Sequence, residues 1–144
     1  MDIKWTDDLT VGVDAIDYQH KELIAIIHNL LKAINRGDAR DEIEKVMAFL
    51  KMYVEVHFLM EETLMLNINY PQDKLLEHEA QHAQFWDTYD ELVVIFKKDH
   101  CSPVLLDTIK NVLVGWFANH MRKTDKAIGV FIKKGGKDTK AYGY

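Results

Sequence analysis

The sequence predicts an all-α fold, an up-down-up-down four-helix bundle preceded by an irregular N-terminal arm. Apolar residues recur at helical spacing over long stretches of the chain. Short turn signals separate these stretches, and the 144 residues include only two prolines and seven glycines. Long helices joined by short turns place sequence neighbours antiparallel, which gives the up-and-down order.

Residues 1–17 show no clear period and are expected to form the arm. The four helices are expected over residues 18–36, 41–66, 72–97 and 104–124 or beyond. Gly37 ends the first helix, turn residues Asn67 to Pro71 end the second, and Pro103 suits the first turn of the fourth. A single domain over 1–144 is therefore expected, with the bundle at 18–128 and a C-terminal segment and polar tail at 129–144.

Charge and composition exclude several classes of function. The net charge of −5 argues against a nucleic-acid partner. No run of eighteen apolar residues exists, so no membrane span is expected, and the N-terminal MDIKWTDDLT lacks the apolar core of a secretory signal. Cys101 is the single cysteine, which excludes a disulfide framework within one chain. A cytoplasmic location is expected.

The stretch HEAQH, from His78 to His82, matches the H-E-x-x-H signature of helical zinc proteases. The spacing itself shows only that two imidazoles share one helix face. A zinc peptidase and a pair of ordinary helix histidines are therefore both open on this motif alone. The longer pattern H-E-x-x-H-x-x-G-x-x-H fails, because Phe85 and Thr88 occupy the places of its glycine and third histidine.

Every expected helix offers at least one possible metal ligand. In chain order these are His20, then His57 and Glu61, then His78 and His82, then His120 and Asp125. Side chains on facing helices of a bundle can converge on its axis, where metal sites are built. Five imidazoles and two carboxylates exceed what one ion can use but suit two ions bridged by the carboxylates. Nitrogen and oxygen donors without thiolate suit iron among the redox metals, and zinc, manganese and cobalt stay open.

The ligand count also predicts an open coordination position. With two bridging carboxylates and an oxo or hydroxo bridge, five histidines split three and two, which leaves one ion five-coordinate. The spacing of His120 and Asp125 is awkward, since five residues turn an ideal helix to about 140° from its start. A wide turn such as a π-bulge, or the end of the helix, is therefore predicted near residues 123–125.

These motifs together resemble the hemerythrin family, in particular its single-domain bacterial members. The matching segments are DYQHKEL around His20, HFLMEE from His57, HEAQH, and WFANHMRKTD from Trp116 to Asp125. The similarity covers about residues 1–130. It departs at Met121, where such domains often carry isoleucine, which concerns the shape of the ligand pocket rather than metal binding.

The resemblance implies a non-haem di-iron protein that binds dioxygen reversibly, for carriage, storage or delivery. It implies one iron on His78, His82 and His120, a five-coordinate iron on His20 and His57, and bridges from Glu61 and Asp125. A sensor of oxygen, nitric oxide or redox state is one alternative, and a di-iron oxidase or peroxidase is another. Carboxylate-type di-iron enzymes use two Glu-x-x-His motifs, and only Glu79 to His82 supplies one here, so no enzyme is expected.

Two further expectations concern the pocket and the partners. The candidate pocket walls, which are expected to serve the core first, are Ile24, Leu113, Trp116 and Phe117. The chain is expected to be a monomer or a weak homo-oligomer. A sensor would have to act through a separate protein, and its contact is expected on the C-terminal tail, residues 134–144.

Overall fold

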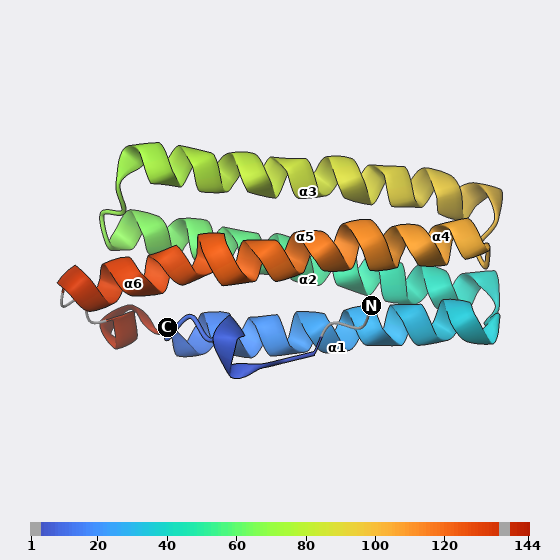
Figure 1. Cartoon of the computed structure of the whole chain (residues 1–144), viewed down its shortest axis with the longest axis horizontal. Helices are drawn as coiled ribbons and strands as arrows, with labels where there is room; N and C mark the ends of the chain where they lie inside the picture. The colour runs from blue at the N-terminus through green and yellow to red at the C-terminus, as the bar shows by residue number, and fades with distance from the viewer. Residues whose placement is uncertain (1–3, 136–138) are drawn as a thin grey trace.

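Four long helical segments lie antiparallel in the computed structural model of the chain, which describes residues 4–135 and 139–144 (Figure 1). The first three are α1 (Asp14–Arg36), α2 (Arg40–Asn67) and α3 (Gln72–Lys98). The fourth runs through α4 (Pro103–Thr108), α5 (Val114–Asn119) and α6 (Lys126–Gly135), joined by π-helical turns at Ile109–Leu113 and His120–Asp125. The predicted all-α bundle is confirmed. None of the helices in the described part of the chain has an apolar stretch long enough to cross a bilayer.

Helix α1 begins at Asp14, four residues before the expected Tyr18, so the arm ends at Val13 rather than at residue 17. Two aspartates in the first turn favour the helix N-terminus through its dipole. One of them, Asp17, accepts hydrogen bonds from the backbone N–H of Val11 (2.8 Å) and of Gly12 (3.2 Å). Because these polar residues interrupt the apolar pattern, the first turn of the helix was not predicted, although Ile16 is buried in that turn.

The fourth segment continues to Gly135, which corrects the expected end of the bundle at residue 128 and the expected C-terminal segment from 129. Ile128 and Ile132 are both buried one turn apart, so the core-facing side of the helix extends past Gly129. Beyond it, Thr139–Tyr142 forms a short 3₁₀ helix. Residues 136–138 of the expected polar tail lie outside the described residues.

The N-terminal arm packs against the fourth segment at the π-helical turn that joins α5 to α6. Leu9, Val11 and Val13 are buried. The Arg122 guanidinium donates to the Asp8 carboxylate (2.7 Å), and the Lys126 ammonium donates to the Asp8 carbonyl (3.0 Å). The arm therefore contributes buried residues to the core, and it includes one 3₁₀ turn, Asp7–Leu9.

Two apolar clusters divide the interior along the bundle axis. The longer cluster includes Leu23, Phe58, Phe85 and Phe117. The shorter cluster, nearer the ends of the chain, includes Ile16, Leu64, Leu75 and Ile128. On each of the four segments the candidate ligands lie at the boundary between these two clusters, so the fold places a polar layer between two apolar ones.

Candidate metal centre

The predicted ligand side chains all lie in this polar layer and are all buried. Each is at most 3% exposed: His20, His57, Glu61, His78, His82, His120 and Asp125. Among the residues that the structure describes, no other histidine or charged side chain is buried to this degree. The four segments of the bundle each contribute at least one of them, as the sequence predicted.

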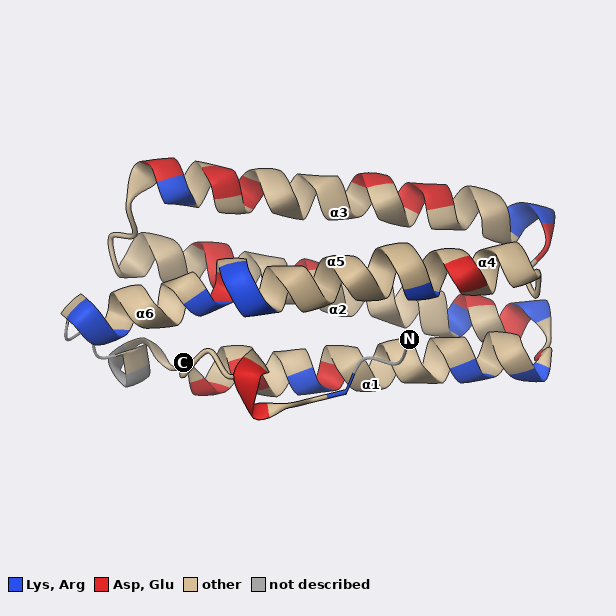
Figure 2. Ribbon diagram, viewed as in Figure 1, with Lys and Arg blue, Asp and Glu red and all other residues tan. Residues whose placement is uncertain are grey.

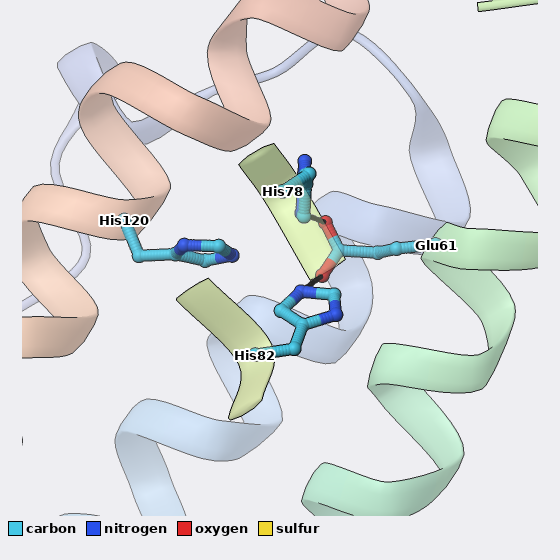
Figure 3. A group of neighbouring side chains, drawn as sticks. All are labelled: Glu61, His78, His82 and His120. Atoms are coloured by element: carbon cyan, nitrogen blue, oxygen red, sulfur yellow. Dashed lines mark ion pairs between the residues drawn. The ribbon is translucent and has the colours of Figure 1, made fainter. Parts of the chain in front are cut away.

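The side chains form two groups that share one carboxylate. The first group is Glu61, His78, His82 and His120 (Figure 3), and the second is His20, His57, Glu61 and Asp125. Within each group the ligand atoms lie within 4.8 Å of one another. Glu61 Oε1 lies 3.0 Å from His57 Nε2 and 3.5 Å from His82 Nε2, and its Oε2 lies 3.8 Å from His78 Nε2. The carboxylate of Glu61 therefore stands between the two groups.

Asp125 occupies a similar position from the fourth segment. Its Oδ1 lies 3.0 Å from His120 Nε2 and 3.2 Å from His78 Nε2. Its Oδ2 lies 2.8 Å from His20 Nε2. One oxygen of this carboxylate faces the first group and the other faces the second, so both carboxylates are placed to bridge two ions.

A π-helical turn brings Asp125 onto the same side of the helix as His120. The turn spans His120–Asp125, where the wide turn was predicted, and that prediction is confirmed. A π turn holds more residues than an α turn, so residues five apart come close to alignment. In an unbroken α-helix the Asp125 carboxylate would point away from the cluster.

The atoms that face the centre of the cluster have no hydrogen-bond partner, although they lie close together. These atoms are both oxygens of Glu61 and Asp125 and the Nε2 atoms of His20, His78, His82 and His120. A buried polar atom without a partner costs roughly 1–3 kcal/mol. So many in one place are typical of side chains that bind a ligand together. Imidazole nitrogens and carboxylate oxygens are the donors that divalent iron, zinc and manganese accept, so these residues fit a pair of metal ions.

Three of the imidazole rings are anchored from behind by hydrogen bonds from Nδ1–H. The acceptors are Gln19 Oε1 for His57 (2.7 Å), Glu62 Oε1 for His82 (3.0 Å) and Gln81 Oε1 for His120 (2.9 Å). Each bond places the proton on Nδ1 and leaves the Nε2 lone pair directed into the cluster. The anchors therefore set both the tautomer and the orientation of the rings.

These three anchors were not predicted from the sequence. Each is a sequence neighbour of a ligand on its own helix but binds a ring on another helix: Gln19 precedes His20, Glu62 follows Glu61, and Gln81 precedes His82. One step along a helix turns the side chain by about 100°, which directs it across the neighbouring interface. The one sequence feature that could have indicated these anchors is a polar residue next to a predicted ligand.

Further contacts hold the anchors and the rings. The Thr124 hydroxyl donates to Gln81 Oε1 (2.7 Å), which ties the π turn to α3. The ring of Phe58 stacks on that of His82 at 3.7 Å between centroids. Trp116 stacks on His120 at 4.5 Å and also lines a surface depression of about 270 Å³.

The other candidate pocket walls belong to the longer apolar cluster. Ile24, Leu113 and Phe117 are buried there, and Trp116 packs against it half-buried. The prediction that these four residues belong to the core is therefore confirmed. Their role as walls of a ligand pocket stays a prediction.

Burial governs the electrostatics of the cluster. Burial, and then the charge of neighbouring imidazoles, lowers the pKa of His57 and brings that of His82 to about 2. Burial, and then Asp125, raises the pKa of Glu61 well above its ordinary value. Burial would also raise the pKa of Asp125, but the surrounding histidines outweigh it and hold that pKa well below its ordinary value. The rings of His57 and His82 are thus neutral, as metal binding requires.

The peptidase interpretation of HEAQH receives no support from this geometry. Glu79, the general base in that interpretation, is exposed and belongs to neither group. His78 and His82 instead meet a third histidine, His120, from the fourth segment.

Comparison with known proteins gives an independent result. Residues 11–130 match the Hemerythrin HHE cation binding domain. The Bacteriohemerythrin of Pseudomonas paraeruginosa is 34% identical over 121 residues, which is 84% of this chain and 75% of that protein. The Bacteriohemerythrin of Stenotrophomonas maltophilia is 30% identical over 132 residues, 90% of this chain and 80% of its own length. The matched region contains every residue of the two groups.

Proposed function

We propose, since the chain belongs to the hemerythrin family, that its buried cluster holds two iron ions and binds dioxygen reversibly. The observation that carries this proposal is the pair of ligand groups sharing Glu61, whose central atoms lack any other partner. Two buried carboxylates repel each other, and divalent cations between them would remove that repulsion.

The proposed ligand sets follow the two groups. His78, His82 and His120 would hold one iron, and His20 and His57 the other, with Glu61 and Asp125 shared between them. The iron with fewer histidine ligands would be the one that dioxygen reaches. When bound, the two ferrous ions supply the two electrons that dioxygen takes up on binding and returns on release.

The residues of the chain have a supporting part in this function. The apolar clusters on both sides of the polar layer keep water and protons away from the ligand. The anchors Gln19, Glu62 and Gln81 keep the imidazoles fixed through binding and release. A site dominated by neutral imidazoles donates less charge than a carboxylate-rich one, which favours reversible binding over oxygen activation.

An oxygen carrier or store is favoured over an enzyme by the arrangement of Glu79. The single Glu-x-x-His motif contributes only its histidine to the cluster, because Glu79 is exposed. A cytoplasmic location and a monomeric or weakly associating chain are parts of the same proposal.

The proposal is tested by cycling the protein between reduced and oxygenated states. Protein loaded anaerobically with ferrous iron should contain about two irons per chain and gain visible absorption on stopped-flow mixing with dioxygen. The absorption should bleach on deoxygenation and return over repeated cycles. Asp125→Asn should lose iron, whereas Glu79→Gln should cycle as the wild type does. One-way decay with continuing oxygen consumption would indicate an enzyme, and a chain that retains only zinc would refute the di-iron proposal.

A further inference from the structure

Helix α2 presents a continuous apolar stripe to solvent. Its members are between 49 and 65% exposed: Phe49, Met52, Val56, Leu59 and Leu66. With Thr63 they follow one another at alternating steps of three and four residues, which is the spacing of a helix that pairs with another helix. The stripe spans about 26 Å of the helix.

This stripe is separate from the side of α2 that forms the core. The inward side of the helix carries buried residues including Leu50, Val54 and Leu64. Among the described residues, α1 exposes only Tyr18 as a large apolar side chain, and α3 exposes only Leu76 and Val94. Exposed apolar residues are ordinarily scattered singly, and a contiguous set marks an interaction surface.

Carboxylates border the stripe on its α3 side. Glu55 and Glu62 lie on α2, and α3 contributes Glu79 and Asp90 opposite them. Their proximity is visible in the pKa of Tyr89 on α3, which burial raises first and Asp90 and Glu55 then raise further. Acidic positions recur along α3 in Figure 2.

One carboxylate lies on the α1 side of the stripe as well. Burial, and then Glu22 of α1, raises the pKa of Tyr53 on α2 to about 12, so this carboxylate also lies at the border. From Met52 to Leu66 the helix has no lysine or arginine, and Lys51, between Phe49 and Met52, is the one basic residue within the length of the stripe. Lys45, nearer the start of α2, pairs with Glu42 (3.2 Å).

We propose that the stripe is a docking surface for an amphipathic helix of another protein, one whose apolar residues repeat at steps of three and four and are flanked by lysine and arginine. Apolar contact along the stripe supplies affinity, and the acidic borders select a cationic partner. A second copy of this chain would place carboxylates against carboxylates in an α2–α2 pair. The proposal does not depend on iron in the buried cluster.

The test uses two synthetic helical peptides of about 21 residues with the same leucine repeat, one with lysine and one with glutamate at the flanking positions. The full-length protein should bind the lysine peptide at least about tenfold more tightly than the glutamate peptide, and added salt should weaken that binding. The double variant Val56→Thr, Leu59→Gln should weaken binding of the lysine peptide at least about tenfold.

The control is the double variant Val94→Thr, Leu76→Gln on α3, which makes the same substitutions at similarly exposed positions outside the stripe. It should bind the lysine peptide as the wild type does. Equal affinity for both peptides, no binding of either, or equal losses in the two double variants would overturn the proposal. Sedimentation as a dimer that Val56→Thr, Leu59→Gln dissociates would assign the stripe to a second copy instead.

Discussion

At the scale of single residues, the three anchored imidazoles are not equivalent. His57 and His120 donate Nδ1–H to neutral amides, whereas His82 donates to the carboxylate of Glu62. A carboxylate acceptor makes the imidazole a stronger electron donor and a more strongly held ligand. Glu62 is partly exposed, so it has this effect without the cost of a fully buried charge.

Replacing Glu62 with alanine is expected to weaken iron binding about ten- to a hundredfold, because the His82 ring loses its anchor. Glu62→Gln keeps an acceptor and should lose less. Competition with a chelator measures the affinities, and Glu79→Gln, which removes an exposed carboxylate one helix away, serves as the control. Equal affinity in Glu62→Ala and the wild type would show that the anchor has no influence on the metal.

Acid is expected to destabilise the metal-free protein. The folded state lowers the pKa of His57 and of His82, the latter from 6.5 to about 2, so below about pH 6.5 the unfolded chain binds more protons. The raised pKa of Glu61 has the opposite effect on stability at pH values above its ordinary pKa of 4.5. It is a single group, however, and the two histidines outweigh it. The free energy of unfolding, measured with urea, should fall as the pH is lowered from about 6.5 to about 5. A constant or rising value would contradict neutral buried rings.

At the scale of helices and turns, the sequence carries the information that is local. The clustering of the candidate ligands could be predicted because spacings such as His57 to Glu61 fix which side chains share a helix face, and the five-residue step to Asp125 required a wide turn. The anchors could not be predicted, because a hydrogen bond such as that from His57 to Gln19 depends on how two helices are aligned. The start of α1 was missed because aspartates interrupt its apolar pattern. The π turn at Ile109–Leu113 has no sequence signal that we can identify.

The contact between the arm and α6 makes a prediction about two glycines of the fourth segment. A methyl group on Gly129 would overlap the Val11 carbonyl, whereas one on Gly115 meets nothing within 4 Å. Gly129→Ala should therefore lower the free energy of unfolding by about 1–3 kcal/mol. Gly115→Ala should raise it by about 0.5–1 kcal/mol through its better helix propensity. Urea denaturation of both variants measures this, and a stabilised Gly129→Ala would mean that the arm does not pack there.

At the scale of the whole molecule, the polar layer lowers the stability of the metal-free bundle, and bound metal ions would cross-link its helices there. Apolar clusters lie on both sides of it, and the layer contains buried atoms without partners from all four segments of the bundle. Ions bound there would join the four segments at one point. Stability and function would then depend on the same side chains.

Removing the metal is accordingly expected to lower the free energy of unfolding by more than about 4 kcal/mol, the linkage expected for an ion held at about a thousand times its Kd. For a domain of this size, that corresponds to a fall in Tm of at least about 8 °C. Thermal unfolding before and after anaerobic chelation measures the difference. Identical transitions would show that the cluster does not hold the bundle together.

Anomalous diffraction at the iron edge would show directly whether each of the two groups holds one iron, as proposed. Crystals of iron-loaded protein should give two peaks, one beside His78, His82 and His120 and one beside His20 and His57, with Glu61 and Asp125 between them. A single peak between His78 and His82, or no iron signal within the polar layer, would contradict the proposal.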